Sequence, residues 1–177
     1  MSQDKKTYYR NIAYTAILLA LASLLSVLEG IFISPFTVPG VKIGLANICV
    51  FAAFFFVSKT SAFLISLFRP VLVFLLYSNP YSFAISLCGA LLSYLALFSL
   101  GALKGRIFTF IGISSFCAFI HICGQFFAAS MLLSMSVWTY FPLSAFLAVL
   151  SGVITGILMN VLFFKMHFLR NGEKDEN

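Results

Sequence analysis

Six long apolar segments, separated by short polar connections, constrain the fold of this chain more than any other feature. A helix needs roughly 20 residues, with a range of roughly 17–25, to cross the hydrocarbon core of a bilayer. The segments are residues 11–33, 43–57, 61–77, 81–103, 107–135 and 140–167. The second is short and begins with polar residues, so we expect it to enter at an angle or to extend through the preceding loop. The pattern predicts an all-α integral membrane protein with about six transmembrane helices.

The composition supports a membrane protein rather than a soluble one. Hydrophobic residues make up 62% of the 177 residues and charged residues only 9%, whereas soluble domains carry roughly 25% charged residues. No Pro/Ser-rich linker or charge run divides the chain, so we predict one transmembrane domain over residues 1–177. The apolar stretch 12–28 is longer than the roughly 7–15 residues of a secretory signal and no small-residue cleavage site follows, so we interpret it as a retained helix.

The basic residues predict the orientation of the bundle. Nine of the eleven lie at the ends of apolar segments on the side of the termini, and the connections on the other side contain only Lys42. This asymmetry predicts that both termini are cytoplasmic in a multi-pass protein of the cytoplasmic membrane. Residues 1–10 and 169–177 would be cytoplasmic segments, and residues 30–41 an extracellular lid-like loop. The scattered charges, which sum to +6, form no basic patch, so nucleic acid is not an expected partner.

Six polar residues stand at or near membrane depth, where a charge costs at least ~2.5–3.5 kcal/mol. They are Glu29, Lys42, Asn47, Arg69, His121 and Gln125. We interpret them as candidates for lining an outward-opening cavity that contacts a polar substrate. The alternatives are structural: Glu29 and Arg69 could form a buried ion pair that sets helix register, and His121 could be a packing residue. His121 and Gln125 are one helical turn apart, which places them on one face.

Lys42 follows the run Val38-Pro39-Gly40, where a rigid turn meets the start of a predicted helix. Gly44 lets another backbone or a ligand approach closely, and a helix N-terminus attracts negative charge. Lys42 is therefore a candidate for contacting an anion, the alternative being a lysine whose amine reaches the membrane interface.

Small residues form one face of the first predicted helix. Ala13, Ala16, Ala20 and Ser23 recur at steps of three or four residues. Glu29 lies nine residues beyond Ala20, which at about 100° per residue places it on the opposite face. One side of this helix could lie close against a partner backbone while the other delivers a carboxylate inward.

The last predicted helix also carries a ridge of small residues, each four apart: Ser144, Ala148, Gly152, Gly156 and Asn160. Such a ridge lets two membrane helices approach closely. The sequence leaves open whether it packs within the monomer or forms a dimer or partner face.

Soluble-enzyme motifs are missing from the sequence. It has no Gly-rich phosphate loop, zinc-binding H-E-x-x-H or nucleophile elbow. Asp4 and Asp175 are the only aspartates, and both lie in the tails, whereas magnesium chemistry on a diphosphate uses clustered carboxylates. We therefore predict no catalytic residue, no metal and no cofactor, and energised transport would need a partner that hydrolyses ATP.

The motif around Lys42 resembles that of a known family. The run from Val38 to Asn47, VPGVKIGLAN, follows a helix ending in Leu28-Glu29 and resembles the Gx transporter family, whose members are also labelled heptaprenyl diphosphate synthase component I. The likeness covers most of the chain through Arg69, His121-x-x-x-Gln125 and Ser151-Gly152-x-x-Thr155-Gly156. The family in turn is similar to the substrate-binding S-components of energy-coupling factor (ECF) vitamin transporters, six-helix membrane proteins in which an Ala-x-x-x-Ala docks the coupling protein.

The resemblance implies a binding subunit with an S-component-like bundle. It would capture a small vitamin-like or isoprenoid/quinone-related solute from outside, with a transmembrane coupling subunit and an ATPase pair as partners. The six polar residues would bind the solute, and Ala16, Ala20 and Ser23 would dock the partner. Two alternatives stay open: a membrane scaffold for extracytosolic flavin/quinone electron transfer or quinone side-chain synthesis, and a prenyl diphosphate enzyme. The missing carboxylates disfavour the enzyme.

Overall fold

A computed structural model describes residues 3–32, 41–101, 109–133 and 137–175. Throughout these ranges the regular elements are helical. They are α1 (Gln3–Phe32), α2 (Asn47–Ala52), the π-helix η2 (Ala53–Val57), α3 (Lys59–Tyr77), α4 (Pro80–Gly101), α5 (Phe110–Leu132), the 3₁₀ helix η3 (Val137–Tyr140) and α6 (Phe141–Asp175). Five described stretches are long and apolar enough to cross a membrane, which confirms a multi-pass helical membrane protein. The sixth crossing and the orientation stay predictions.

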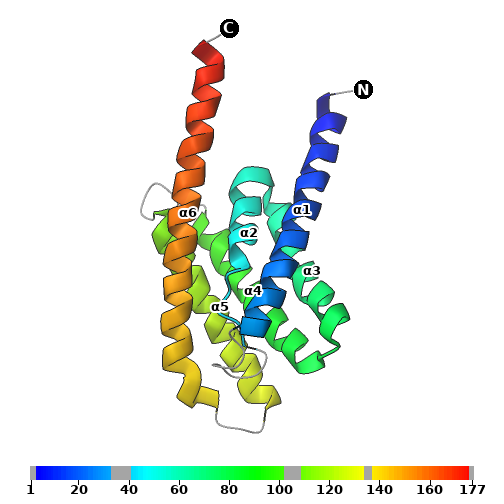
Figure 1. Cartoon of the computed structure of the whole chain (residues 1–177), viewed down its shortest axis with the longest axis vertical. Helices are drawn as coiled ribbons and strands as arrows, with labels where there is room; N and C mark the ends of the chain where they lie inside the picture. Colours follow the sequence, from blue (N-terminus) through cyan, green and yellow to red (C-terminus); the bar gives the residue numbers. More distant parts are fainter. Residues whose placement is uncertain (1–2, 33–40, 102–108, 134–136, 176–177) are drawn as a thin grey trace.

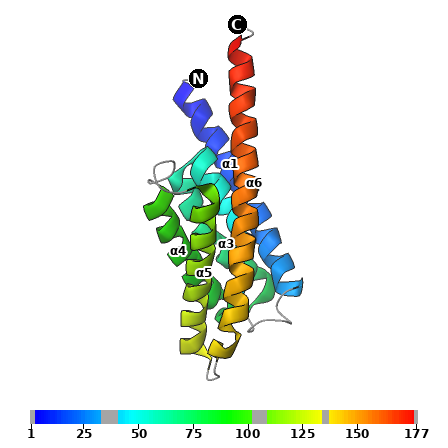
Figure 2. The ribbon, with the colours of Figure 1, turned by 90° about the vertical axis from the view of Figure 1, so that its left-hand side faces the viewer.

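The helices form an elongated bundle with both termini at the same end (Figure 1). At that end α1 and α6 extend beyond the other helices, and α6 continues as far as Asp175, through most of the predicted tail. Figure 2, a view from the side, shows α4, α5 and α6 running alongside one another. A shared end for the termini is the arrangement that the distribution of basic residues predicts.

Two helix starts in the bundle are set by hydroxyl caps. Ser58 is extended, and its Oγ accepts a hydrogen bond from the backbone N–H of Ser61 at 3.0 Å. Thr109 plays the same part for α5, since its Oγ1 accepts from the N–H of Gly112 at 3.2 Å. Such caps satisfy backbone donors that have no partner in the first turn of a helix. The helix starts predicted at residues 61 and 107 are therefore shifted to Lys59 and Phe110.

The second predicted span is wrong at its start. Residues 43–46 are not helical, and regular helix begins only at Asn47 and ends at Val57. Gly44 has a φ of 97°, in the left-handed region that interrupts a helix. The backbone N–H groups of Lys42, Gly44 and Leu45 donate to side chains of α1 and α5 instead. Non-helical backbone is tolerated at membrane depth only where protein groups satisfy it in this way.

The small-residue ridge of α6 packs against α5. Its members Ser144, Ala148, Gly152 and Gly156 are buried, whereas Asn160 is exposed. A Cβ atom added at Gly152 would lie 2.6 Å from the Cα of Ser115 in α5, so the two backbones are in close contact. Of the two interpretations of this ridge, packing within the monomer is confirmed for its buried members.

Gly152→Ala is expected to destabilise the bundle by about 1–3 kcal/mol, because the added methyl group must push α5 and α6 apart. Gly30→Ala is a matched control in α1, since a Cβ there meets no atom within 4 Å. Thermal unfolding of the detergent-purified variants measures the difference. Equal midpoints for the two variants would contradict the close α5–α6 contact.

Candidate functional site

The non-helical segment 41–46 is the centre of the candidate site, and two buried side chains hold its backbone. Glu29 of α1, 3% exposed, accepts hydrogen bonds at its Oε1 from the N–H of Gly44 at 2.6 Å and of Leu45 at 3.1 Å. Gln125 of α5, fully buried, accepts at its Oε1 from the N–H of Lys42 at 2.8 Å. Helices distant in sequence thus fix the path of this segment.

Arg69 of α3 is joined to the start of α2 rather than to Glu29. Its Nη1 donates to the Oδ1 of Asn47 at 3.0 Å, and both side chains are buried. Glu29 lies close enough to Arg69 and Lys42 to be attracted by their charges. No hydrogen bond or ion pair within 4.0 Å joins Glu29 to Arg69 among the residues that the structure describes. The direct ion pair considered from the sequence is therefore replaced by separate contacts to the segment.

His121 completes the cluster from α5. Its Nε2 and the Nε2 of Gln125 are 2.9 Å apart, as their spacing of one turn predicts. The ring also packs against Gly44, where an added Cβ would lie 3.3 Å from the His121 Cδ2. Lys42 lies in segment 41–46, and the other five predicted site residues gather around that segment. Whether they bind a solute stays a prediction.

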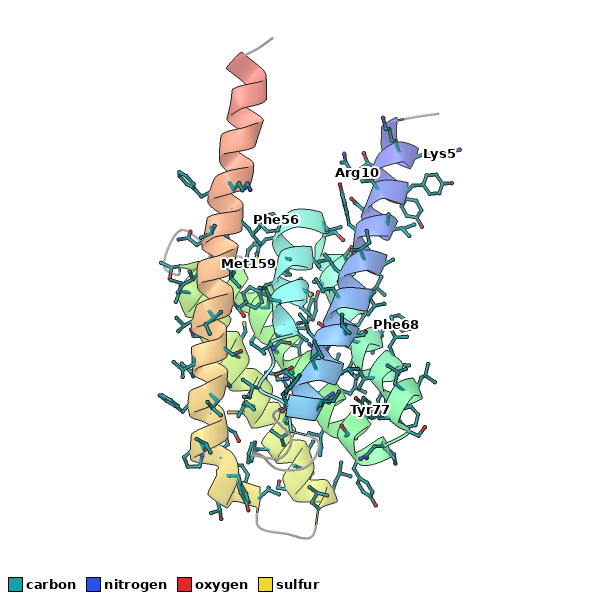
Figure 3. The ribbon with its side chains drawn as sticks, viewed as in Figure 1. Lys5, Arg10, Phe56, Phe68, Tyr77 and Met159 are labelled. Carbon is teal, nitrogen blue, oxygen red and sulfur yellow. The ribbon has the colours of Figure 1, made fainter. Side chains whose placement is uncertain are left out.

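A cavity of about 250 Å³ opens beside this cluster. It lies between the end of α1, the second half of α3 and the start of α4. Of the six predicted residues only Lys42 lines it. The wall also includes the hydroxyl residues Ser26 and Ser86 and the aromatic residues Phe74, Tyr77 and Phe83. Figure 3 shows Tyr77 toward the end of the bundle opposite to Lys5 and Arg10, that is, away from the termini.

Sequence reasoning missed the wall residues other than Lys42. Serines and phenylalanines are common in apolar helices and by themselves indicate no site. One signal was present: Ser82, Ser86 and Ser93 recur at intervals of four and seven residues, which places them on one face of α4. Of these three, Ser82 and Ser86 line the cavity, whereas the Ser93 Oγ donates to the carbonyl of Cys117 in α5 at 3.1 Å.

Lys42 has an unusual environment for a lysine. It is 9% exposed, and burial, together with the nearby charge of Arg69, lowers the pKa of its amine to about 8, although Glu29 opposes this shift. The amine therefore gains or loses its proton near neutral pH, which ordinary lysines do not. Its charge can respond to what occupies the cavity.

The predicted docking residues of α1 divide between two environments. Ala16 and Ala20 are exposed, while Ser23 is 8% exposed and its Oγ donates to the carbonyl of Leu19 in its own helix at 2.8 Å. Glu29 is buried, which agrees with its predicted place opposite Ala20. Docking itself stays a prediction. Of the predicted lid-like loop 30–41, residues 33–40 lie outside the described residues.

The described residues contain no group of three or more His, Cys, Asp or Glu side chains that could hold a metal ion.

Comparison with known proteins identifies the family of the chain. A family model described as heptaprenyl diphosphate synthase component I matches residues 18–162. Neither the curated proteins nor the solved structures gave a match. The matched range contains the cavity, segment 41–46 and all six buried polar residues. The chain therefore belongs to the heptaprenyl diphosphate synthase component I family, as the motif around Lys42 predicts.

Proposed function

We propose that this chain is the substrate-binding, S-component-like subunit of an energy-coupling factor-type uptake transporter in the cytoplasmic membrane. Its cargo would be a small vitamin-like or isoprenoid/quinone-related solute. The observation that carries the proposal is the cavity beside the buried Lys42, at the end of the bundle away from both termini. A binding subunit for uptake needs a site at the extracellular end, and the charge asymmetry predicts that this end is extracellular.

The polar cluster supports this role by holding the cavity wall rigid. Gln125 accepts from the N–H of Lys42 itself, and Glu29 accepts from the N–H of Gly44, two residues further on. Arg69 donates to Asn47 at the start of the following helix. A site whose contact residue is held by buried hydrogen bonds loses little conformational entropy when it binds. In this proposal Lys42 contacts the solute, and Glu29, Asn47, Arg69, His121 and Gln125 are positioning residues.

The energy for uptake would come from partners. The sequence has no phosphate-binding loop, so a transmembrane coupling subunit and an ATPase pair are required. Ala16 and Ala20 present small, exposed side chains one turn apart on α1, and such surfaces let a partner helix approach closely. The family name refers to a synthase component, but we propose no catalysis by this chain, whose two aspartates lie in the terminal segments.

Purification of the tagged protein from its native membranes tests the proposal. We expect the coupling subunit and both ATPases to co-purify, and Ala16→Leu with Ala20→Leu to abolish this, because the larger side chains block close approach. Ile17→Phe with Leu21→Phe is the matched control, since it enlarges exposed side chains one position further along the same turns. Retention of the partners by the leucine variant would contradict the docking face.

The identity of the co-purifying proteins tests the transporter itself. Mass spectrometry that finds flavoproteins or a soluble prenyl synthase, and no ATPase, would contradict the transporter and support the membrane scaffold for electron transfer or quinone side-chain synthesis.

A further inference from the structure

The charged side chains buried beside the cavity do not balance. Lys42 and Arg69 are basic and Glu29 is acidic, and all three are at most 9% exposed. The cluster thus has at least one positive charge in excess while Lys42 is protonated. An unbalanced charge at this depth is costly, and a bound anion would neutralise it.

Lys42 is the member of the cluster that can meet such an anion. Glu29 and Arg69 are held by backbone and by Asn47, and neither lines the cavity. Lys42 lines the cavity, and its side chain has no hydrogen bond or ion pair to any other described residue. Its ammonium group is therefore the available cation of the wall.

Ser86 provides a second, independent feature of the same wall. It is 6% exposed, and its Oγ is buried without a hydrogen-bond partner among the residues placed by the structure. A buried hydroxyl with no partner is unfavourable, and it becomes satisfied when a ligand supplies an acceptor. Ser86 lines the same cavity as Lys42, so a small rotation of its side chain would let the hydroxyl donate to the oxygen of a bound carboxylate.

Another part of the wall, formed by two phenylalanines, is suited to an apolar, planar group. The rings of Phe74 and Phe83 are in contact, with centroids 5.3 Å apart and planes inclined by 46°, and both line the cavity. Each of these rings can take part in an offset or edge-to-face contact with the ring of a ligand. The volume of about 250 Å³ lies below the ~300–1,000 Å³ of typical small-molecule sites, which favours a compact solute over a long isoprenoid chain.

From these features we infer that the cavity takes a small organic monoanion, a carboxylate on a planar apolar body. The carboxylate would lie between the Lys42 Nζ and the Ser86 Oγ, with the body against Phe74 and Phe83. Of the three charged residues of the cluster, only Lys42 lines the cavity, and one available cation favours a monoanion over a phosphate dianion. This inference rests on the proposed solute-binding role and names the class of solute.

Binding of an anion should depend on pH through Lys42. Burial and Arg69 lower the pKa of this amine to about 8, so raising the pH from about 7 to about 9 removes the charge and weakens anion binding. A bound anion would raise the same pKa, so binding near pH 8 should take up protons. Lys42 is also faced by Glu29 of α1, Arg69 of α3 and His121 of α5. The pH dependence of binding is therefore assigned to Lys42 only to the extent that a Lys42 variant loses it.

Calorimetric titration of the detergent-purified full chain with three probes tests the inference. Benzoate is the monoanion, benzamide its neutral analogue of the same shape, and phenyl phosphate the dianion. We expect benzoate to bind at least about tenfold more tightly than benzamide, since a charge-assisted hydrogen bond is worth roughly 1.5–3 kcal/mol. Benzoate should also bind more tightly than phenyl phosphate, and with proton uptake near pH 8.

Variants assign the selectivity to its residues. Lys42→Gln should abolish the preference for benzoate and the proton uptake. Ser86→Ala should lower the affinity for benzoate severalfold. Lys59→Gln, an exposed lysine away from the cavity, is the matched control and should change neither. Should Lys42→Gln fail to fold, Lys42→Arg should keep the preference for benzoate while Ser86→Ala still reduces it.

The inference is overturned if benzoate does not bind, if benzamide or phenyl phosphate binds equally well, or if Lys42→Gln retains the preference. Its failure is distinguishable from that of the proposed function. Co-purifying ATPases without benzoate selectivity would leave the transporter standing with another class of solute. Benzoate selectivity without ATPases would leave an anion-binding membrane protein that is not a transporter subunit of this type.

Discussion

Glu29→Ala is expected to lower the free energy of unfolding by about 2–6 kcal/mol. The substitution removes the one acceptor shared by the N–H groups of Gly44 and Leu45. Each buried donor left without a partner costs roughly 1–3 kcal/mol. Water cannot readily replace the carboxylate, since Glu29 is 3% exposed. Thermal or denaturant unfolding of the purified protein in mild detergent measures the loss.

Two controls separate the lost hydrogen bonds from other effects of changing α1. Glu29→Gln removes the charge but keeps an oxygen at the same place, so most of the stability should return. Ser23→Ala is a matched buried position on α1 whose hydroxyl bonds only within its own helix. It should cost no more than about 1 kcal/mol. Glu29→Ala and Ser23→Ala variants of equal stability would contradict the role of Glu29 in holding segment 41–46.

Much of the bundle could be predicted from hydropathy and charge alone. Five apolar segments form membrane-length helices, and the two termini lie at the same end of the bundle. Both features could be predicted because the length of an apolar run and the positions of basic residues are read directly from the sequence. The start of the second segment was predicted wrongly because it depends on contacts with residues distant in the sequence. Residues 43–46 look apolar enough to be helical, but Glu29 and Gln125, far away in sequence, take over the hydrogen bonds of this backbone.

The residues of the candidate site could be predicted from the sequence only in part. A polar group at membrane depth is costly, so it is usually paired or functional. This rule identified Lys42 of segment 41–46 and the five residues around that segment. The rule cannot tell whether a polar atom faces backbone or solvent. Glu29 and Gln125 face backbone, and of the six only Lys42 lines the cavity. Ser86 was missed because a serine in an apolar helix commonly bonds to its own helix, and only the fold shows that its hydroxyl has no such partner.

Gly44→Ala should be nearly as damaging as Glu29→Ala, with an expected loss of about 2–5 kcal/mol. The φ of 97° costs a residue with a Cβ atom roughly 1–2 kcal/mol. The added Cβ would also lie 3.0 Å from the Nδ2 of Asn47 and 3.3 Å from the Cδ2 of His121. Crowding of this kind in a packed interior costs about 1–3 kcal/mol more. Unfolding in detergent, with Gly30→Ala as the unstrained control, measures the total.

The same substitution should also impair the cavity, because its two crowded neighbours hold other parts of the site. Displacing Asn47 removes the partner of Arg69, and displacing His121 disturbs Gln125, which binds the N–H of Lys42. A folded fraction of Gly44→Ala should therefore bind benzoate more weakly than the wild-type chain, although no contact with the probe is changed. Unaltered benzoate affinity would show that segment 41–46 holds its shape independently of these contacts, and the positioning role assigned to the buried cluster would then be wrong.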